Sequence, residues 1–205
     1  AEQAEALAYF PLWSYTHPVA IELAARLASL APGDLNRAFF TTGGGEANEA
    51  MWKVARQWHA ANGQPQRTKA IARHVAYHGT SLGALSFTGI QSMRDPFMPM
   101  PIHVRHVSET NAYRHPEGAD PVAFTKALLD EMEQAIIEEG ADEVAIIIAE
   151  PVQNAGGCFT PPAGYWQGLR ALCDKYGILL VSDDVISAFG RIGEWYGVNA
   201  YGDTP

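Results

Sequence analysis

Two adjacent carboxylates, Asp183 and Asp184, follow an apolar run from Ile178 to Val181. A run without polar alternation is typical of a strand that is buried on both faces of a parallel sheet. Ligands of open α/β sheets bind beyond the carboxyl ends of the strands, so the pattern indicates an acid delivered to a site. The alternative is that Asp183 only turns the chain, as Asp often does. This segment alone favours neither interpretation.

A glycine triplet, Gly43-Gly44-Gly45, lies between a predicted strand over Arg37 to Thr42 and a predicted helix over Glu46 to Trp58. A helix that starts at glycines offers free backbone N–H groups and a positive dipole end to an anion. The triplet is not a dinucleotide fingerprint, because Asn48 stands where the last Gly is needed, and no Gly-Lys-Ser/Thr follows. A plain tight turn is the alternative.

Two further strand ends carry polar or aromatic residues. A predicted strand over Lys69 to His74 is followed by Tyr77-His78-Gly79, and another over Glu143 to Ala149 is followed by Glu150. The carboxyl ends of parallel strands meet at one edge of a sheet. We therefore expect the glycine triplet, Tyr77-His78, Glu150 and Asp183 to converge.

Helices alternate with these strands. Helical spacing of apolar residues predicts helices over Val19 to Leu30, Phe124 to Glu139 and Tyr165 to Tyr176. Such alternation is typical of right-handed βαβ crossovers and of an α/β fold with a mainly parallel (mixed) sheet flanked by helices. We expect the first of these helices to pack in a core. The stretch from Gln91 to Pro121 has little periodicity and predicts a long surface excursion.

Composition narrows the possible partners. With 14 Lys and Arg against 23 Asp and Glu, the formal net charge of −9 disfavours nucleic acid as a partner. The longest apolar run is far shorter than the ~20 residues that span a bilayer, so no membrane partner is expected. Only Cys158 and Cys173 are present, which fits a reducing interior and a cytoplasmic location. The pair His103 and His106 lacks a completing carboxylate or thiol, so no metal site is predicted.

The start of the chain suggests a cut from a longer protein, because it has no initiator Met and no features of a signal peptide. The aromatic stretch from Tyr9 to Tyr15 predicts a pocket or interface lining. We divide the chain into an N-terminal segment, 1–35, that holds this stretch and a helix, and a large domain, 36–205.

Four segments, taken in order, resemble the class III pyridoxal-phosphate aminotransferases, particularly the ω-transaminases. They are Phe-Phe-Thr-Thr-Gly-Gly-Gly-Glu-Ala (39–47), Tyr-His-Gly (77–79), Glu-Pro-Val-Gln-Asn-Ala-Gly-Gly (150–157) and Leu-Leu-Val-Ser-Asp-Asp-Val-Ile-Ser-Ala-Phe-Gly-Arg-Ile-Gly (179–193). Each segment alone is a weak indication of the family, whereas four segments in the order and spacing of the family are a specific one. The resemblance implies the large cofactor-binding domain of fold type I.

The resemblance also implies roles for the convergent residues. Gly43, Gly44 and Gly45 would surround the phosphate of pyridoxal 5′-phosphate through backbone amides, although many relatives have Ser at the first and third positions. Tyr77 would stack on one face of the pyridine ring and Val185 would press on the other, while His78 shapes the turn.

Two carboxylates are the implied catalytic residues. Asp183 would pair with the ring nitrogen, keeping it protonated. Glu150 would support Asp183 or balance a substrate-binding Arg. Asp184 replaces the usual Glu of the family, and Ile186 stands where many relatives place a Gln that bonds the phenolic oxygen of the cofactor.

The Schiff-base lysine of the family would follow Asp203-Thr204-Pro205, so we expect this chain to be truncated before it. The implied activity of the complete protein is transfer of an amino group from an amine or amino acid to a keto acid such as pyruvate, by a homodimer or higher homo-oligomer. An aminomutase or lyase of the same fold is the close alternative. From other classes, a non-catalytic cofactor-binding remnant fits the missing lysine, and a nucleotide-binding oxidoreductase fits the glycines but lacks its fingerprint.

Overall fold

The computed structural model describes residues 2–7, 16–202 and 205. The chain forms two compact units, Ala1–Phe39 and Phe40–Pro205. The predicted interface stretch from Tyr9 to Tyr15 lies outside the described residues. Among those that are described, no helix is both long and apolar enough to cross a membrane.

The first unit holds two helices, α1 (Glu2–Ala6) and α2 (Pro18–Leu30). Proline at the first position of α2 is preorganised for a helix start, and the His17 side chain accepts a hydrogen bond from the Ala20 amide at 3.4 Å. The expectation that this helix packs in a core is wrong, because α2 has no buried residue. Two helices of this length have too little partner surface to bury an apolar stripe.

The second unit is built on a sheet of four parallel strands in the order β2-β1-β3-β4. The strands are β1 (Lys69–Arg73), β2 (His103–Val107), β3 (Val144–Ala149) and β4 (Leu179–Ser182). The α/β class and the parallel sheet predicted from the sequence are confirmed. The chain leaves β1 toward β2 and then returns to the other side of β1 as β3, so the strand order reverses between β1 and β3. A crevice forms at such a point, outside the carboxyl ends of the strands.

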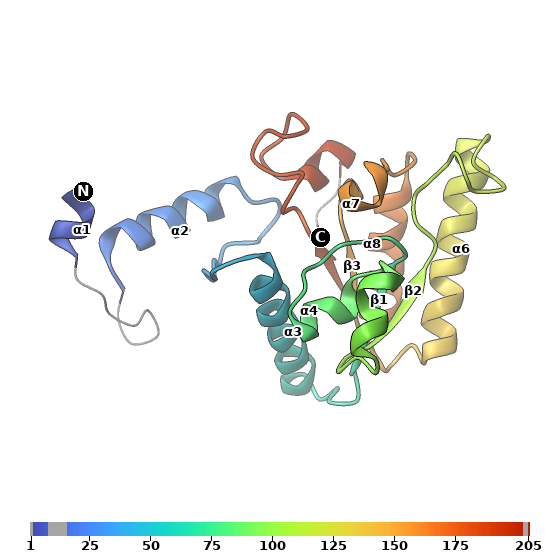
Figure 1. Cartoon of the computed structure of the whole chain (residues 1–205), viewed down its shortest axis with the longest axis horizontal. Helices are drawn as coiled ribbons and strands as arrows, with labels where there is room; N and C mark the ends of the chain where they lie inside the picture. Colours follow the sequence, from blue (N-terminus) through green and yellow to red (C-terminus); the bar gives the residue numbers. More distant parts are fainter. Residues whose placement is uncertain (1, 8–15, 203–204) are drawn as a thin grey trace. The chain divides into compact units, whose positions relative to one another are not determined.

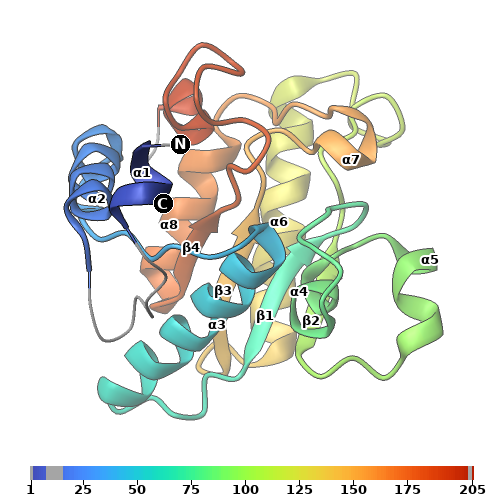
Figure 2. The same ribbon diagram turned by 60° about the vertical axis from the view of Figure 1, so that its left-hand side comes forward.

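Helices cover both faces of the sheet, as Figures 1 and 2 show. Helices α6 (Pro121–Glu139) and α8 (Tyr165–Tyr176) pack on one face, and α3 (Gly44–Ala61) and α4 (Leu82–Phe87) on the other. Shorter helices, α5 (Gln91–Arg94), η1 (Asp95–Phe97), α7 (Asn154–Gly157) and η2 (Gly197–Tyr201), lie in the connections.

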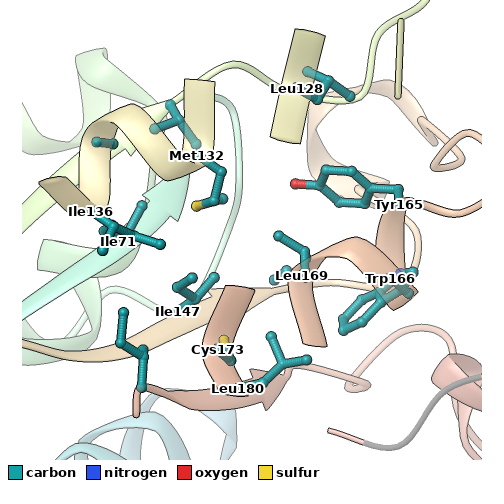
Figure 3. Close-up of a cluster of buried hydrophobic side chains, with 14 of the residues drawn as sticks. Ile71, Leu128, Met132, Ile136, Ile147, Tyr165, Trp166, Leu169, Cys173 and Leu180 are labelled. Atoms are coloured by element: carbon teal, nitrogen blue, oxygen red, sulfur yellow. The ribbon is translucent and has the colours of Figure 1, made fainter. Parts of the chain in front are cut away.

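The larger core lies between the sheet and the pair α6 and α8 (Figure 3). Met132 and Ile136 of α6 face Ile71 of β1 and Ile147 of β3, and Leu169 of α8 fills the space beside them. All six residues of β3 are buried, as the unbroken apolar run predicts. This strand therefore holds the residue that follows it, Glu150, in a fixed place.

Two predicted elements need correction. The residues from Arg37 to Thr42 form no strand, because they pair with no described strand, and Phe39 is 80% exposed. The stretch from Gln91 to Pro121 is not only a surface excursion, because it contains β2, which pairs with β1 along five residues. At the edge of the sheet, β2 reads His-Val-Arg-His-Val with Val107 as its only buried residue, so it lacks the apolar run that marks a strand buried on both faces.

Candidate active site

Three strand ends deliver side chains to one edge of the sheet. Tyr77 and His78 follow β1, Glu150 follows β3, and Asp183 follows β4. The Asp183 amide donates to the Ala149 carbonyl at 2.8 Å, so strand pairing continues one residue past β4. These ends and the start of α3 line a cavity of about 660 Å³.

Asp183 is the most strongly held acid of this cavity. Its Oδ2 accepts hydrogen bonds from His78 Nδ1 at 2.8 Å and Asn48 Nδ2 at 3.0 Å, and its Oδ1 accepts from the Val185 amide at 3.3 Å. Burial opposes the charged form and would raise the pKa of Asp183, but the hydrogen bonds from His78 and Asn48 outweigh it and lower that pKa. The cavity therefore holds an ionised carboxylate.

Asp184 lies outside the cavity lining and has a different task. Its Oδ1 accepts from the Ser187 hydroxyl at 2.9 Å and the Gly197 amide at 2.5 Å, and its Oδ2 accepts from the Ser182 hydroxyl at 2.6 Å. Asp184 thus closes the turn after β4. The neighbouring acids divide into one that faces the cavity and one that holds the loop.

Glu150 is buried beneath the cavity. Its Oε1 accepts from the Tyr77 amide at 3.1 Å, and its Oε2 accepts from Arg73 Nη2 at 3.0 Å. Arg73 Nη2 also donates to the Glu150 carbonyl at 2.6 Å. Because the same carboxylate lies 3.9 Å from His78 Nε2, Glu150 is placed to act on Asp183 through His78.

The start of α3 presents unpaired amides to the cavity. The first bond within the helix runs from the Ala47 amide to the Gly43 carbonyl at 3.0 Å, which leaves the amides of residues 44, 45 and 46 without helical acceptors. Gly44 and Gly45 line the cavity, whereas Gly43 is the N-cap and is not among its lining residues. The dipole and free N–H groups make this end of α3 suited to an anion.

Close approach of two backbones explains the glycines. Gly79 has a φ of +121°, and a Cβ there would lie 2.7 Å from the Gly45 Cα. A side chain at Gly79 would therefore push the β1 turn away from α3. The Tyr-His-Gly turn and the glycine triplet, far apart in the sequence, fit together as one wall.

Tyr77 and Val185 flank the cavity mouth, with 39% and 64% of their surfaces exposed. The Val185 side chain lies close to α3, 3.6 Å from where a Cβ on Gly44 would stand. Ile186 also lines the cavity. An aromatic ring and a branched aliphatic group are suited to hold a flat ligand between them.

Sequence reasoning missed several residues of the site, of which Asn48 is the clearest. Asn48 lies on the inward face of α3 with Trp52, Ala55 and His59, and it is the only one of these four that reaches Asp183. A polar residue in an otherwise core-facing stripe was the available signal. The cavity is also lined by Glu46, Thr80, Ser81, Val152, Asn154 and Ala155.

His103 and His106 do not meet. They lie on opposite faces of β2, where His103 Nε2 contacts Glu139 Oε2 at 2.7 Å and His106 Nδ1 lies 3.1 Å from Arg94 Nη1. Alternate faces of a strand cannot bring residues three apart to one ion.

The aminotransferase class-III family model matches residues 1–205. The chain belongs to the class-III aminotransferases. A probable aminotransferase of Mycobacterium tuberculosis is 51% identical over 205 residues, all of this chain and 44% of that protein. A putrescine–pyruvate aminotransferase of Pseudomonas aeruginosa is 38% identical over 207 residues, 99% of this chain and 45% of that protein.

Solved structures agree with this class-III assignment. An (S)-enantioselective omega-transaminase from Thermomicrobium roseum superimposes with a TM-score of 0.95 at 44% identity, over all of this chain and 46% of that one. An omega transaminase from Pseudomonas jessenii in complex with PMP gives 0.94 at 35% identity, over all of this chain and 46% of that one. The fold is therefore the fold type I α/β architecture, and the chain spans less than half the length of these relatives.

Proposed function

We propose that this chain forms the cofactor-binding part of a pyridoxal-phosphate aminotransferase, which moves an amino group from an amine or amino acid to a keto acid such as pyruvate. The observation that carries the proposal is the ionised Asp183, held toward the cavity by His78 and Asn48. A carboxylate fixed in this way is suited to keep a proton on a ring nitrogen.

The residues present fit pyridoxal phosphate. The anion site at the start of α3 suits a phosphate, and a Cβ on Gly45 would stand only 3.4 Å from the Ser81 hydroxyl, so the glycines leave the backbone open. Tyr77 and Val185 suit the two faces of a pyridine ring, and Asp183 suits its nitrogen. When bound, the cofactor supplies an electron-accepting ring that stabilises the charge left when a proton leaves the substrate carbon.

The chain's own residues have four tasks in this proposal. The amides of residues 44 to 46 bind the phosphate; because the triplet has no hydroxyl groups, these amides carry more of that binding than in relatives with Ser there. Tyr77 and Val185 orient the ring. Asp183 holds the proton of the ring nitrogen, and Glu150 acts on Asp183 through His78.

The lysine that anchors the cofactor is proposed to come from sequence after Pro205. The lining of the cavity in the described part of the chain includes no lysine. Lys69 and Lys175 instead pair with acids of α6 and of the loop after it, Lys126 pairs with Asp130 of its own helix, and Lys53 is exposed on α3. These pairs support a separate source for the anchor.

Pyruvate as acceptor is supported by the names of relatives. Two Pseudomonas aeruginosa proteins, a putrescine–pyruvate and a β-alanine–pyruvate aminotransferase, are 38% and 37% identical to this chain. We also propose a homodimer or higher homo-oligomer that works in the cytoplasm. Exposed Phe189 and Trp195, beside the cavity-lining Val185 and Ile186, support an interface there.

The test uses the full-length protein with pyridoxal phosphate. Purified enzyme is incubated with a primary amine and pyruvate, and alanine formation is measured by chromatography, with oxaloacetate and 2-oxoglutarate as competing acceptors. Alanine formation that requires the cofactor supports the proposal. Tight cofactor binding with ammonia or an isomerised amine as the product would instead favour a lyase or an aminomutase.

A further inference from the structure

A row of four buried polar side chains leads from Arg73 to the lining of the cavity. It begins at Arg73 and passes through Glu150 and His78 to Asp183, with successive contacts of 3.0, 3.9 and 2.8 Å. Arg73, His78 and Glu150 are 1%, 2% and 6% exposed. Arg73, the first member, does not line the cavity and has no role in the proposed function.

The two ring nitrogens of His78 face two carboxylates. Nδ1 bonds to Asp183, whereas Nε2 has no hydrogen-bond partner among the described residues and lies 3.9 Å from Glu150 Oε2. A second proton on the ring would sit on Nε2, facing Glu150. The charge on Glu150 therefore decides whether His78 carries one proton or two.

Arg73 controls that charge. It donates to the same Oε2 that faces His78, and its guanidinium is packed over the Tyr165 ring, 5.9 Å from the ring centre. A negative charge beside a histidine favours its doubly protonated form, and a cation paired with that negative charge weakens the effect. With Arg73 in place, the positive guanidinium compensates the negative charge of Glu150.

Two further titratable groups near this row, His106 and Tyr165, are neutral at neutral pH. His106 of β2 is electrostatically coupled to His78, and burial together with Arg94 lowers its pKa to about 4. Burial raises the pKa of Tyr165, which packs against Arg73. The balance around His78 is thus set by Arg73, Glu150 and Asp183.

We propose that Arg73 is a positioning residue that acts through Glu150 to keep a single proton on His78, so that Asp183 presents its full negative charge to the cavity. The inference rests on the proposed function, because the group that Asp183 would meet is the pyridine nitrogen. Loss of Arg73 leaves Glu150 uncompensated and places a second proton on His78. The resulting imidazolium shares the charge of Asp183 and weakens its hold on the ring.

The test compares full-length variants stripped of cofactor and titrated with pyridoxal phosphate. Arg73→Met should raise the Kd for the cofactor about tenfold and move the pH at which the bound cofactor changes absorbance about one unit lower. Arg73→Lys, which keeps the charge, should lie between this variant and the wild type. The double variant Arg73→Met/Glu150→Gln removes the uncompensated charge and should recover most of both losses.

Recovery in the double variant separates charge compensation from simple packing. If the double variant binds the cofactor no better than Arg73→Met, or if Arg73→Met matches the wild type in both readouts, the role of Arg73 is wrong. If Arg73→Met does not fold, the double variant and Arg73→Lys are compared with the wild type. The proposal requires both variants to keep most of the wild-type affinity for the cofactor, whereas a packing role for Arg73 requires the double variant to lose it.

A matched control is Arg67, another buried arginine. It lies at the opposite end of the strands, where Nη1 donates to the Ala141 and Val144 carbonyls and Nη2 to the Tyr176 carbonyl. Arg67→Met should lower thermal stability without moving the absorbance transition. A wild type that does not bind pyridoxal phosphate would refute the proposed function, whereas wild-type binding without the pattern above would refute only the role of Arg73.

Discussion

At the scale of single residues, the environment of each carboxylate separates the roles of two neighbouring acids. Asp183 accepts from a histidine, an amide side chain and a backbone N–H at the cavity, whereas Asp184 accepts from two serines and a backbone N–H in a loop. Both are acids next to each other in the sequence. Only the first is held where a ligand can meet it.

Asp183→Asn tests that division. The amide keeps the shape of the side chain but removes the charge, so turnover of the full-length enzyme should fall about 10- to 100-fold, the value of one hydrogen bond to a charged group. Single-turnover kinetics with amine donor measure the loss. Asp184→Asn is the control and should lower the free energy of unfolding by about 1–2 kcal/mol with little effect on cofactor affinity. Near-normal turnover in Asp183→Asn would refute the assigned role.

At the scale of elements, the site depends on the contact between the β1 turn and the start of α3. Gly79 and Gly45 touch backbone to backbone, which sets the distance between Tyr77 and the free amides of α3. The phosphate and ring positions of a bound cofactor are therefore coupled through two glycines. A substitution at this contact should weaken cofactor binding by more than its effect on the free energy of unfolding would explain.

Gly79→Ala is the corresponding variant. Its Cβ would meet Gly45 Cα at 2.7 Å and Ala84 Cβ at 3.0 Å, in addition to the cost of a positive φ. Gly63→Ala shares the positive φ, at +77°, but meets nothing within 4 Å, so it isolates that cost of about 1–2 kcal/mol. Calorimetry should give a larger loss for Gly79→Ala, with weaker cofactor binding only there. Equal losses in the two variants would contradict the contact.

The edge strand β2 carries a histidine that should make the fold sensitive to acid. His106 contacts Arg94 through Nδ1 and the Phe87 carbonyl through Nε2, and burial lowers its pKa from 6.5 to about 4. The unfolded chain takes up a proton near pH 6.5 while the folded ring stays neutral, so stability falls as the pH drops from about 6.5 to 4. Linkage gives at most about 3 kcal/mol, less where water reaches the ring.

His106→Gln should lose this part of the acid sensitivity. The amide does not titrate, so the difference in the urea midpoint of unfolding between pH 7.5 and pH 4.5 should be smaller than in the wild type. If His106→Gln keeps the wild-type difference between the two pH values, His106 is not its source.

At the scale of the whole molecule, three layers hold the cavity edge in place. Helices α3 and α4 cover one face of the sheet, and α6 and α8 cover the other. The most buried strand, β3, lies in the interior of the sheet. The strand ends therefore move together. A ligand that joins several of them should stabilise the entire fold.

Cofactor binding should accordingly raise the thermal stability of the full-length protein. At a free concentration 100 times its Kd, a ligand that binds only the folded state adds about 2.7 kcal/mol. Differential scanning calorimetry with pyridoxal phosphate measures the shift, and pyridoxal without the phosphate is the control. Equal shifts from the two ligands would contradict an anion site at the start of α3.

The sequence by itself determined the α/β class, the strands β1, β3 and β4, and the residues that follow them. The run before Asp183 was expected to be buried on both faces, but β4 lies at the edge of the described sheet and only Leu180 of its four residues is buried. The unbroken run of β3 is fully buried inside the sheet, and the carboxyl ends of parallel strands share an edge. Glu150, Asp183, Tyr77 and His78 were predictable for that reason. The family followed from the order of the four segments.

Only the tertiary structure decided what depends on contacts between distant segments. The edge strand β2 has no apolar run, and the predicted strand from Arg37 to Thr42 has no partner, since pairing is a property of neighbours. Asn48 and Arg73 meet Asp183 and Glu150 across separations of 135 and 77 residues. No local pattern encodes such a meeting, because it depends on how α3 and β1 pack against the sheet.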